Sequence, residues 1–200
     1  DRDAYGIYVQ SPFPKENRRI LIGSDVSSRY TRRNRAEYRK IAGYIARCVW
    51  QRQGNYMVFF PSYRLMEDVL QVYEEEFSVD WVRCVCQTPD MTEQEREGFL
   101  EEFQEREGTL VGFCVLGGIF SEGVDLTGES LIGAVIVGTG LPQIGSQREI
   151  LKEYYDKKNH CGFDYAYRYP GMNKVLQAAG RVIRTKEDKG VILLLDDRFW

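Results

Sequence analysis

Two arginines at helical spacing are the residues best suited to chemistry in this sequence. Arg181 and Arg184 lie three positions apart in "QAAGRVIRTKEDKGVILLLDDRF" (177–199), and Gln177 precedes the first of them by four. Because positions i, i+3 and i+4 share one helical face, we expect these three side chains to point the same way. The small residues 178–180 would let the backbone approach a ligand closely. Two guanidiniums and an amide could clamp an anion or could form a solvated surface, and this segment alone does not decide between them.

A second candidate is the segment "GGIFSEGVDLTG" (117–128), which is rich in glycine and carboxylates. Glycine suits a backbone that turns sharply or approaches a ligand. Glu122 and Asp125 could accept hydrogen bonds from sugar hydroxyls or pair with the two arginines, although an acidic surface loop explains the pattern equally well. The phosphate-binding pattern G-x-x-x-x-G-K-[ST] is absent, so in a nucleotide hydrolase another segment would have to supply that loop.

Other polar residues have simpler explanations. Ser62 and Tyr63 follow an apolar run in "VFFPSY", where Ser62 can cap the next helix, and the same helix N-terminus can also bind phosphate. His160 has no Ser, Cys or metal-ligand partner at useful spacing and is interpreted as a loop residue. Cys84 and Cys86 alternate as strand residues do, and core packing in a reducing compartment explains them better than metal ligation. We therefore expect no metal site.

Charge is distributed unevenly along the chain. The net charge is −3, yet residues 1–60 carry twelve Lys and Arg against five Asp and Glu, whereas residues 61–107 carry four against fourteen. The basic block is densest at "SSRYTRRNRAEYRK", which contains Arg32, Arg33 and Arg35. Such a block forms either a solvated helix face or, with its interleaved tyrosines, a surface that follows phosphates.

Short aliphatic runs alternate with longer amphipathic segments, which predicts an α/β fold with a mostly parallel sheet and ligands beyond the carboxyl ends of the strands. The 200 residues fit one domain, and no run approaches the roughly 20 apolar residues that cross a bilayer. Strands are expected at 18–23, 55–60, 79–86, 109–117, 130–138 and 190–196. Helices are expected at 34–52, 63–77, 91–105 (with a capping box of Thr92 and Glu95), 145–159 and 172–184.

In combination these segments resemble the second motor domain of the XPD/DinG family of superfamily-two DNA helicases. The resemblance covers essentially the whole chain. It rests on "SPFP", "GNYMVFFPSY", "GGIFSEGVDLTG", "GTGLP" and a Q-x-x-G-R-x-x-R box followed by D-x-R-F. It implies a RecA-like three-layer sandwich, with residues 1–200 as a single domain. It further implies that ATP is hydrolysed in the cleft against a first motor domain, and that duplex DNA is unwound by tracking along a single strand, usually 5′-to-3′.

The resemblance also implies roles for individual residues. Arg181 and Arg184 match the arginines that reach across the cleft to the γ-phosphate, and Gln177 matches the glutamine that senses it. Other matches concern nucleotide binding and its coupling to DNA (Glu122, Gly123, Asp125 and Gly180), the DNA-proximal side (Ser62 and Tyr63) and a structural arginine in D-x-R-F (Arg198). The basic block with Arg32, Arg33 and Arg35 is the further candidate for DNA contact.

Two features of the family are absent from this chain: the Walker A and D-E-A-H boxes, and the four cysteines that hold an iron–sulfur cluster. Both belong to the first motor domain of the family. We therefore interpret the chain as a fragment of a longer helicase, inactive alone, that shares ATP and Mg²⁺ with that domain and holds no iron–sulfur cluster itself. The expected partners are single-stranded and forked DNA and the first motor domain, with no membrane.

The expected location is the cytoplasm, on the nucleoid if the source is bacterial. Two alternatives to the DNA helicase remain open at this point. One is a RecA-like module that binds nucleic acid or a protein without hydrolysing ATP, and the other is a motor domain of an RNA helicase, since the ATP chemistry is shared.

Overall fold

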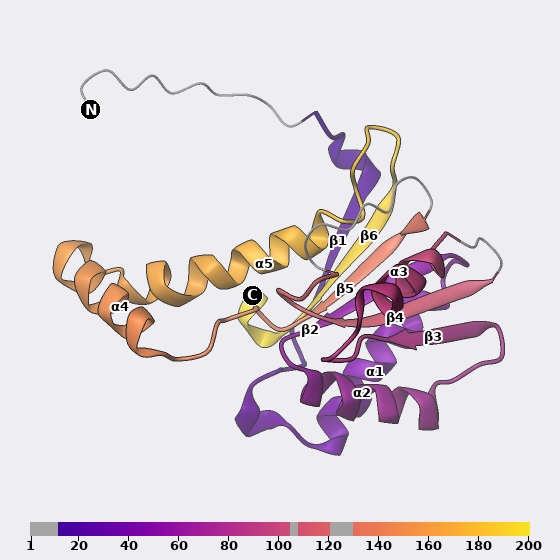
Figure 1. The fold of residues 1–200 in the computed structure, drawn as a ribbon, viewed down its shortest axis with the longest axis horizontal. Helices are drawn as coiled ribbons and strands as arrows, with labels where there is room; N and C mark the ends of the chain where they lie inside the picture. The colour runs from indigo at the N-terminus through magenta and orange to yellow at the C-terminus, as the bar shows by residue number, and fades with distance from the viewer. Residues whose placement is uncertain (1–11, 105–107, 121–129) are drawn as a thin grey trace.

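A parallel sheet of six strands forms the centre of the computed structural model, which describes residues 12–104, 108–120 and 130–200 (Figure 1). The strand order is β1-β6-β5-β2-β4-β3, and every neighbouring pair runs parallel. The strands are β1 (Arg18–Gly23), β2 (Asn55–Phe60), β3 (Val82–Cys86), β4 (Thr109–Val115), β5 (Gly133–Val137) and β6 (Gly190–Leu195). The predicted α/β fold with a parallel sheet is confirmed.

Helices cover both faces of the sheet and give three layers (Figure 1). The helices are α1 (Arg35–Val49), α2 (Tyr63–Glu76), α3 (Glu93–Glu101), α4 (Ser146–Asn159) and α5 (Tyr169–Ala179), with a π-helical turn η4 (Asp164–Arg168) directly before α5. Short 3-10 turns lie at η1 (Lys15–Asn17), η2 (Tyr30–Arg32) and η5 (Asp197–Phe199). The predicted capping box of Thr92 and Glu95 is present, and His160 ends α4 in the left-handed conformation.

The two faces of the sheet carry separate hydrophobic cores, because side chains alternate along each strand. In β2, Val58 and Phe60 enter the core formed with α1 and α2, whereas Met57 and Phe59 enter the core formed with α3 and α5. Strands β2, β4 and β5 are buried throughout, as their continuous apolar runs predict for strands covered on both sides. The edge strand β1 is mostly exposed.

The helix predicted over 172–184 differs from the structure at both ends. It begins earlier, at Tyr169, and ends at Ala179, so the arginine pair lies beyond the helix. Gly180 is a poor helix former, and the side chain of Asp188 accepts hydrogen bonds from the backbone N–H groups of Arg184 (2.8 Å) and Thr185 (2.7 Å). These two N–H groups are therefore paired without a helical carbonyl.

The cysteines pack as expected. Cys84 and Cys86 are half-buried against the core of α1 and α2, and burial raises the pKa of each thiol to about 11. Both thiols are therefore protonated near neutral pH and are weak metal ligands. Across the described residues, no group of three or more His, Cys, Asp or Glu side chains could hold a metal ion.

Asp196, the first residue after β6, is a fully buried carboxylate. It accepts hydrogen bonds from the N–H (2.9 Å) and Oγ (2.7 Å) of Ser28 and from Nε (2.6 Å) of Arg198. Burial alone would raise the pKa of this carboxyl, but the hydrogen bonds from Arg198 and Ser28 outweigh burial and hold the pKa well below its usual range. The D-x-R-F arginine is thus part of the framework, as the sequence suggested.

Gly138, the first residue after β5, lies beside the same network. It has a φ of 83°, and a Cβ at this position would lie 2.5 Å from Oγ of Ser28. Only glycine adopts this conformation readily and leaves room for the serine. This network therefore holds together the carboxyl ends of β5 and β6 and the segment after β1. We call this side of the sheet, where the parallel strands end, its carboxyl edge.

We predict that Asp196→Ala lowers the free energy of unfolding at pH 7 by about 3–5 kcal/mol, because it leaves the half-buried Arg198 guanidinium without its carboxylate. The control is Asp197→Ala. Asp197 pairs at 3.5 Å with the exposed Arg29, and its removal should cost only about 0–1 kcal/mol. Urea unfolding of both variants is the measurement. Equal destabilisation of the two variants would contradict this assignment.

The stabilisation by Asp196 should depend on pH in a defined direction. The folded-state pKa is depressed, so this stabilisation is fully present above the unfolded-state pKa of about 3.9 and is lost as pH falls toward the folded-state value. The difference between the original chain and Asp196→Ala should therefore shrink below about pH 4. Unfolding curves at a series of pH values test this, and a difference that grows with acid would be inconsistent with it.

Candidate functional site

The residues of the arginine box surround one open pocket at the C-terminus of α5. Gln177, Gly180, Arg181 and Arg184 all line this pocket, whose volume is about 570 Å³. Leu176, Ile183, Thr185 and Phe13 complete its lining. The predicted grouping is therefore present, although the helical geometry from which it was predicted is not. Only Gln177 belongs to the helix, whereas both arginines lie in the turn and the irregular segment that follow it.

Hydrogen bonds to Asp188 shape the segment that presents the arginines. Besides the two backbone bonds, Asp188 accepts a bond from Thr185 Oγ1 (2.8 Å). Burial opposes ionisation of Asp188, but the bonds from Thr185 and Arg184 outweigh it and lower the pKa of this carboxyl. Asp188 thus stays charged and keeps the turn in place. The acidic pair that trails the box in the sequence is the signal that could have revealed this role.

The pocket lies beside the amino ends of β1 and β6, opposite the carboxyl edge of the sheet. Asn17, just before β1, donates a hydrogen bond to the carbonyl of Lys186 (2.7 Å), which lies four residues before β6. The other polar segments predicted as ligand sites follow the carboxyl ends of the strands. The arginine box is therefore at the opposite edge, and α5 spans the distance between the two.

The small residues before the arginines do not act as a group. Ala178 is fully buried in the core between α5 and the sheet, so its size suits packing against the strands. Gly180 is exposed and lines the pocket, with an ordinary helical conformation. Of these residues, Gly180 is the one that lines the pocket.

Glu122, Gly123 and Asp125 lie outside the described residues. What is described is the start of their segment after β4. Gly117 has a φ of 72°, and the side chain of Lys174 from α5 lies against it. The segment therefore starts beside α5 at the carboxyl edge of the sheet.

Ser62 and Tyr63 are held at the carboxyl end of β2 by a network that the sequence did not reveal. Ser62 caps α2 by accepting a hydrogen bond from Leu65 N–H (3.4 Å), as predicted. Gln87, which is buried, donates from Nε2 to Tyr63 Oη (2.9 Å) and accepts from the N–H of Val115 (3.0 Å). One amide thereby links the ends of β3 and β4 to α2. Its signal in the sequence is a polar residue directly after a strand.

The basic block mostly pairs with carboxylates of the same chain. Arg35 binds Glu75 (2.7 Å) and Glu76 (3.0 Å) on α2, and Arg39 binds Glu76 (2.5 Å). These ion pairs join the basic and acidic halves that the composition separates. Their charges partly cancel, which leaves less positive field there for a phosphate backbone than the count of arginines suggests.

Three further arginines belong to the block: Arg29 pairs with Asp197 (3.5 Å), and Arg32 and Arg33 are attached near the loop. Arg32 lies 3.4 Å from the buried carboxylate of Glu37, and Arg33 donates from Nε to the carbonyl of Ser28 (3.2 Å) and lies over the ring of Tyr30. Through Ser28 this loop joins the carboxyl edge of the sheet. In the sequence, Arg32 and Arg33 are therefore nearer than Arg35 to Ser28, the residue that attaches the loop to that edge.

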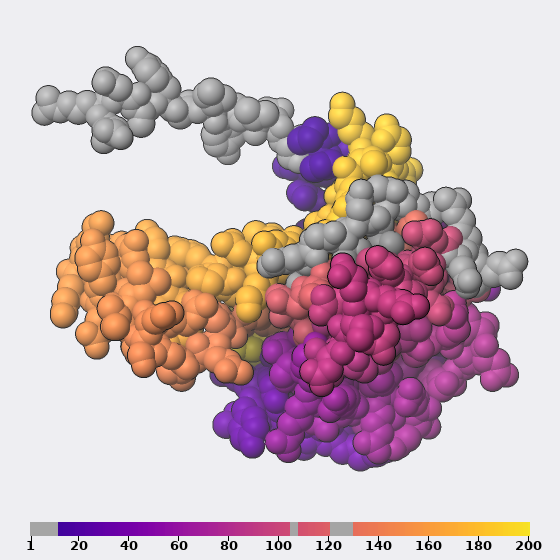
Figure 2. Space-filling model, viewed as in Figure 1, coloured from indigo at the N-terminus to yellow at the C-terminus, as the bar shows by residue number. Residues whose placement is uncertain are grey.

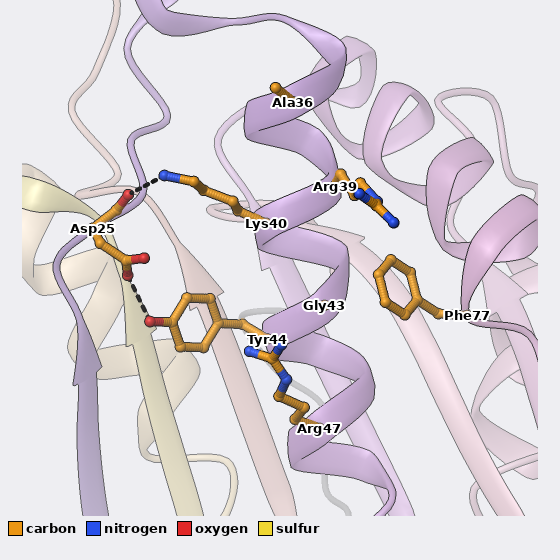
Figure 3. Close-up of a pocket in the computed structure, with 8 residues that line it drawn as sticks. All are labelled: Asp25, Ala36, Arg39, Lys40, Gly43, Tyr44, Arg47 and Phe77. Atoms are coloured by element: carbon orange, nitrogen blue, oxygen red, sulfur yellow. Dashed lines mark hydrogen bonds between the residues drawn. The ribbon is translucent and has the colours of Figure 1, made fainter.

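Figure 3 shows a second pocket, on the outer face of α1, with a volume of about 490 Å³. Lys40 donates to the carbonyl of Asp25 (3.3 Å), and Tyr44 donates to its carboxylate (2.5 Å). Arg39 and Arg47 flank the same pocket. The polar bonds here attach α1 to the segment after β1, so the pocket is explained by packing.

The chain is similar in sequence and fold to several helicases. A solved structure of an XPD helicase superposes with a TM-score of 0.73 at 27% identity, and the match covers 91% of this chain and 32% of that one. The ATP-dependent DNA helicase XPD of Sulfolobus acidocaldarius is 30% identical over 189 residues, which are 89% of this chain and 31% of the relative. A probable ATP-dependent helicase of Methanocaldococcus jannaschii is 28% identical over 204 residues, with 96% and 31% coverage.

The chain thus spans about a third of the length of these relatives. Across the described residues, no helix is long and apolar enough to cross a membrane. The model of the helicase C-terminal domain family matches residues 45–200, which include the arginine box and both Asp196 and Arg198. The chain therefore belongs to the helicase C-terminal domain family.

Proposed function

We propose that this chain is the second motor domain of an ATP-dependent DNA helicase of the XPD/DinG type. The observation that carries the proposal is the grouping of Gln177, Gly180, Arg181 and Arg184 around one pocket in a chain of this family. The pocket has no phosphate-binding loop of its own, so it forms half of a site. The other half belongs to a first motor domain.

In this proposal Arg181 and Arg184 stabilise the charge that develops on the γ-phosphoryl group as it is transferred to water. A guanidinium offers a planar fork of donors that fits phosphate oxygens, and its position is fixed before the reaction begins. Asp188 supports this role because it holds the backbone of Arg184. Gln177, exposed on the last turn of α5, would contact the nucleotide from the helix side.

The carboxylates that hold Mg²⁺ are expected from the first motor domain, as the family resemblance implies. When bound with ATP, Mg²⁺ would neutralise charge on the phosphates. The parts proposed for this chain are the arginines and the coupling segment with Glu122, Gly123 and Asp125. That segment follows β4 in the sequence and would connect the nucleotide to the DNA surface.

The proposed path of single-stranded DNA follows the carboxyl edge of the sheet, past Ser62 and Tyr63. The N-terminus of α2 offers backbone N–H groups that favour a phosphate, and Tyr63 is oriented by Gln87. Arg32 and Arg33 extend from a loop that is bound to the same edge through Ser28. Forked DNA would be the substrate of the whole enzyme, in which a duplex is opened ahead of this path.

The 200-residue chain alone should show no DNA-stimulated ATP turnover, since it lacks the phosphate-binding loop and its metal-holding partners. The measurement is phosphate release with and without single-stranded DNA. As a control, joining the chain to a first motor domain with Walker A and B boxes should create activity. Turnover by the purified chain alone, with contaminating helicases excluded, would contradict the half-site.

In an enzyme that holds both motor domains, Arg181→Ala or Arg184→Ala should lower kcat for DNA-stimulated ATP hydrolysis by about 10³–10⁵-fold, or roughly 4–7 kcal/mol. Lysine should not restore activity at either position, because it is a point charge without a planar fork. The matched control is Lys189→Ala, an exposed cation of the same loop, which should keep kcat unchanged. Melting temperatures should be equal throughout. Near-normal kcat in both arginine variants would refute the proposed role.

Binding of single-stranded DNA by the chain should be weak and strongly dependent on salt. Replacing Arg32, Arg33 and Arg35 together by alanine should reduce the slope of log K against log salt by about 0.7 for each phosphate that these arginines neutralise. Arg35→Ala alone should contribute least, since Glu75 and Glu76 already pair with it. Titrations at several salt concentrations give the slopes. An unchanged slope in the triple variant would mean that the block is a solvated surface.

A further inference from the structure

Four tyrosine rings form a continuous row on α4, η4 and the start of α5. Tyr155 stacks on Tyr165, with ring centroids 4.1 Å apart and an interplanar angle of 8°. Tyr154 meets Tyr155 edge-on at 5.1 Å, and Tyr169 meets Tyr165 edge-on at 5.2 Å. We call Tyr154, Tyr155, Tyr165 and Tyr169 the tyrosine row.

Packing of the domain does not explain the tyrosine row. No residue of α4 is buried, and this region forms a lobe that stands out from the body of the molecule (Figure 2). Tyr154, Tyr165 and Tyr169 are 55%, 39% and 48% exposed. Contiguous exposed apolar surface of this kind marks binding sites in soluble proteins, and π-helical turns such as η4 are frequent at functional sites.

Cations accompany the row. Nζ of Lys158 lies 5.7 Å and 5.9 Å from the centroids of the first two rings, and Lys157 beside it is exposed. Two nearby carboxylates have internal partners: Asp156 accepts a backbone N–H at 2.8 Å, and Asp164 forms an ion pair at 2.8 Å with the arginine four residues later. Glu153 is the exposed carboxylate on this part of α4. The row therefore combines aromatic faces with positive charge.

We propose that the tyrosine row is a stacking platform for the bases of single-stranded DNA, with Lys157 and Lys158 directed to its phosphates. Flat rings bind any base through its π-face, and adjacent cations bind the backbone, which is the combination that sequence-independent single-strand binding requires. The lysines beside the rings would favour a protein partner only if that partner were acidic. The inference rests on the proposed function, because a motor that tracks along DNA needs contacts that tolerate every sequence.

The test measures binding of the 200-residue chain to fluorescent oligothymidine and to an abasic oligonucleotide of equal length, which keeps the phosphates but lacks bases. The two exposed ends of the row are replaced, as Tyr154→Ala and Tyr169→Ala. Each change should weaken oligothymidine binding by about fivefold or more, and should leave abasic binding nearly unchanged. Tyr154→Phe and Tyr169→Phe keep the ring and should bind normally. Tyr154→Leu keeps bulk without a π-face and should behave like the alanine variant.

Three results would overturn the proposal. Unchanged oligothymidine binding in the alanine variants would assign the row to a protein contact. Equal weakening for both oligonucleotides would mean that the rings only support the lysines or the fold, which melting temperatures would also report. If the unmodified chain bound no DNA, the tyrosine row could not be a platform for DNA bases. The motor function is judged separately, by the loss of ATP turnover in the Arg181→Ala enzyme, in which the tyrosine row is unchanged.

Discussion

The pairing of the buried Asp196 carboxylate is the interaction on which the arrangement of the sheet's carboxyl edge depends. A charge without access to water must be paired, and its partners here come from Ser28 and from Arg198. The bond to Ser28 joins segments 168 residues apart in the sequence. Because Gly138 leaves space for the same serine, the ends of β5 and β6 and the segment after β1 form one rigid edge. Of the residues proposed to contact DNA at this edge, Arg33 is attached to that network through Ser28, whereas Tyr63 is positioned by Gln87.

Helix α5 connects this edge to the arginine pocket. Near its start, Gly171 packs so closely on Thr139, at the carboxyl edge, that a Cβ would lie 2.6 Å from the threonine carbonyl oxygen. Its last residues reach the pocket at the other edge, about 16 Å away for an eleven-residue helix. Residues from both proposed binding surfaces are therefore attached to one stiff element. In the proposed motor, a shift of α5 driven from the nucleotide side would move Lys174 and Tyr169 together, which would couple the two ligand sites.

Much of this fold could be predicted from the sequence, because aliphatic runs and amphipathic periods report burial directly. The strands, the capping box and the half-buried Cys84 and Cys86 are examples. The family resemblance was also confirmed. The end of α5 was not predictable in this way, since the spacing of Arg181 and Arg184 fits a helix equally well. What decides the conformation there is a side chain several residues later, Asp188, whose hydrogen bonds compete with the helix for the same N–H groups.

Counts of charged residues along the sequence mislead for the same reason, because they do not include the partners that the fold brings close. The excess of arginine in the first part of the chain predicts a phosphate-binding surface, but α1 lies against the acidic α2, and Arg35 and Arg39 pair with Glu75 and Glu76. Exposed ion pairs of this kind add little to the stability of the fold and are screened by salt. They nevertheless reduce the positive field that would attract a polyanion. Stacking on exposed rings is not reduced by neighbouring carboxylates. In the proposed platform, a domain with several internally paired arginines would therefore hold a single strand through aromatic contacts, with a few cations for the backbone.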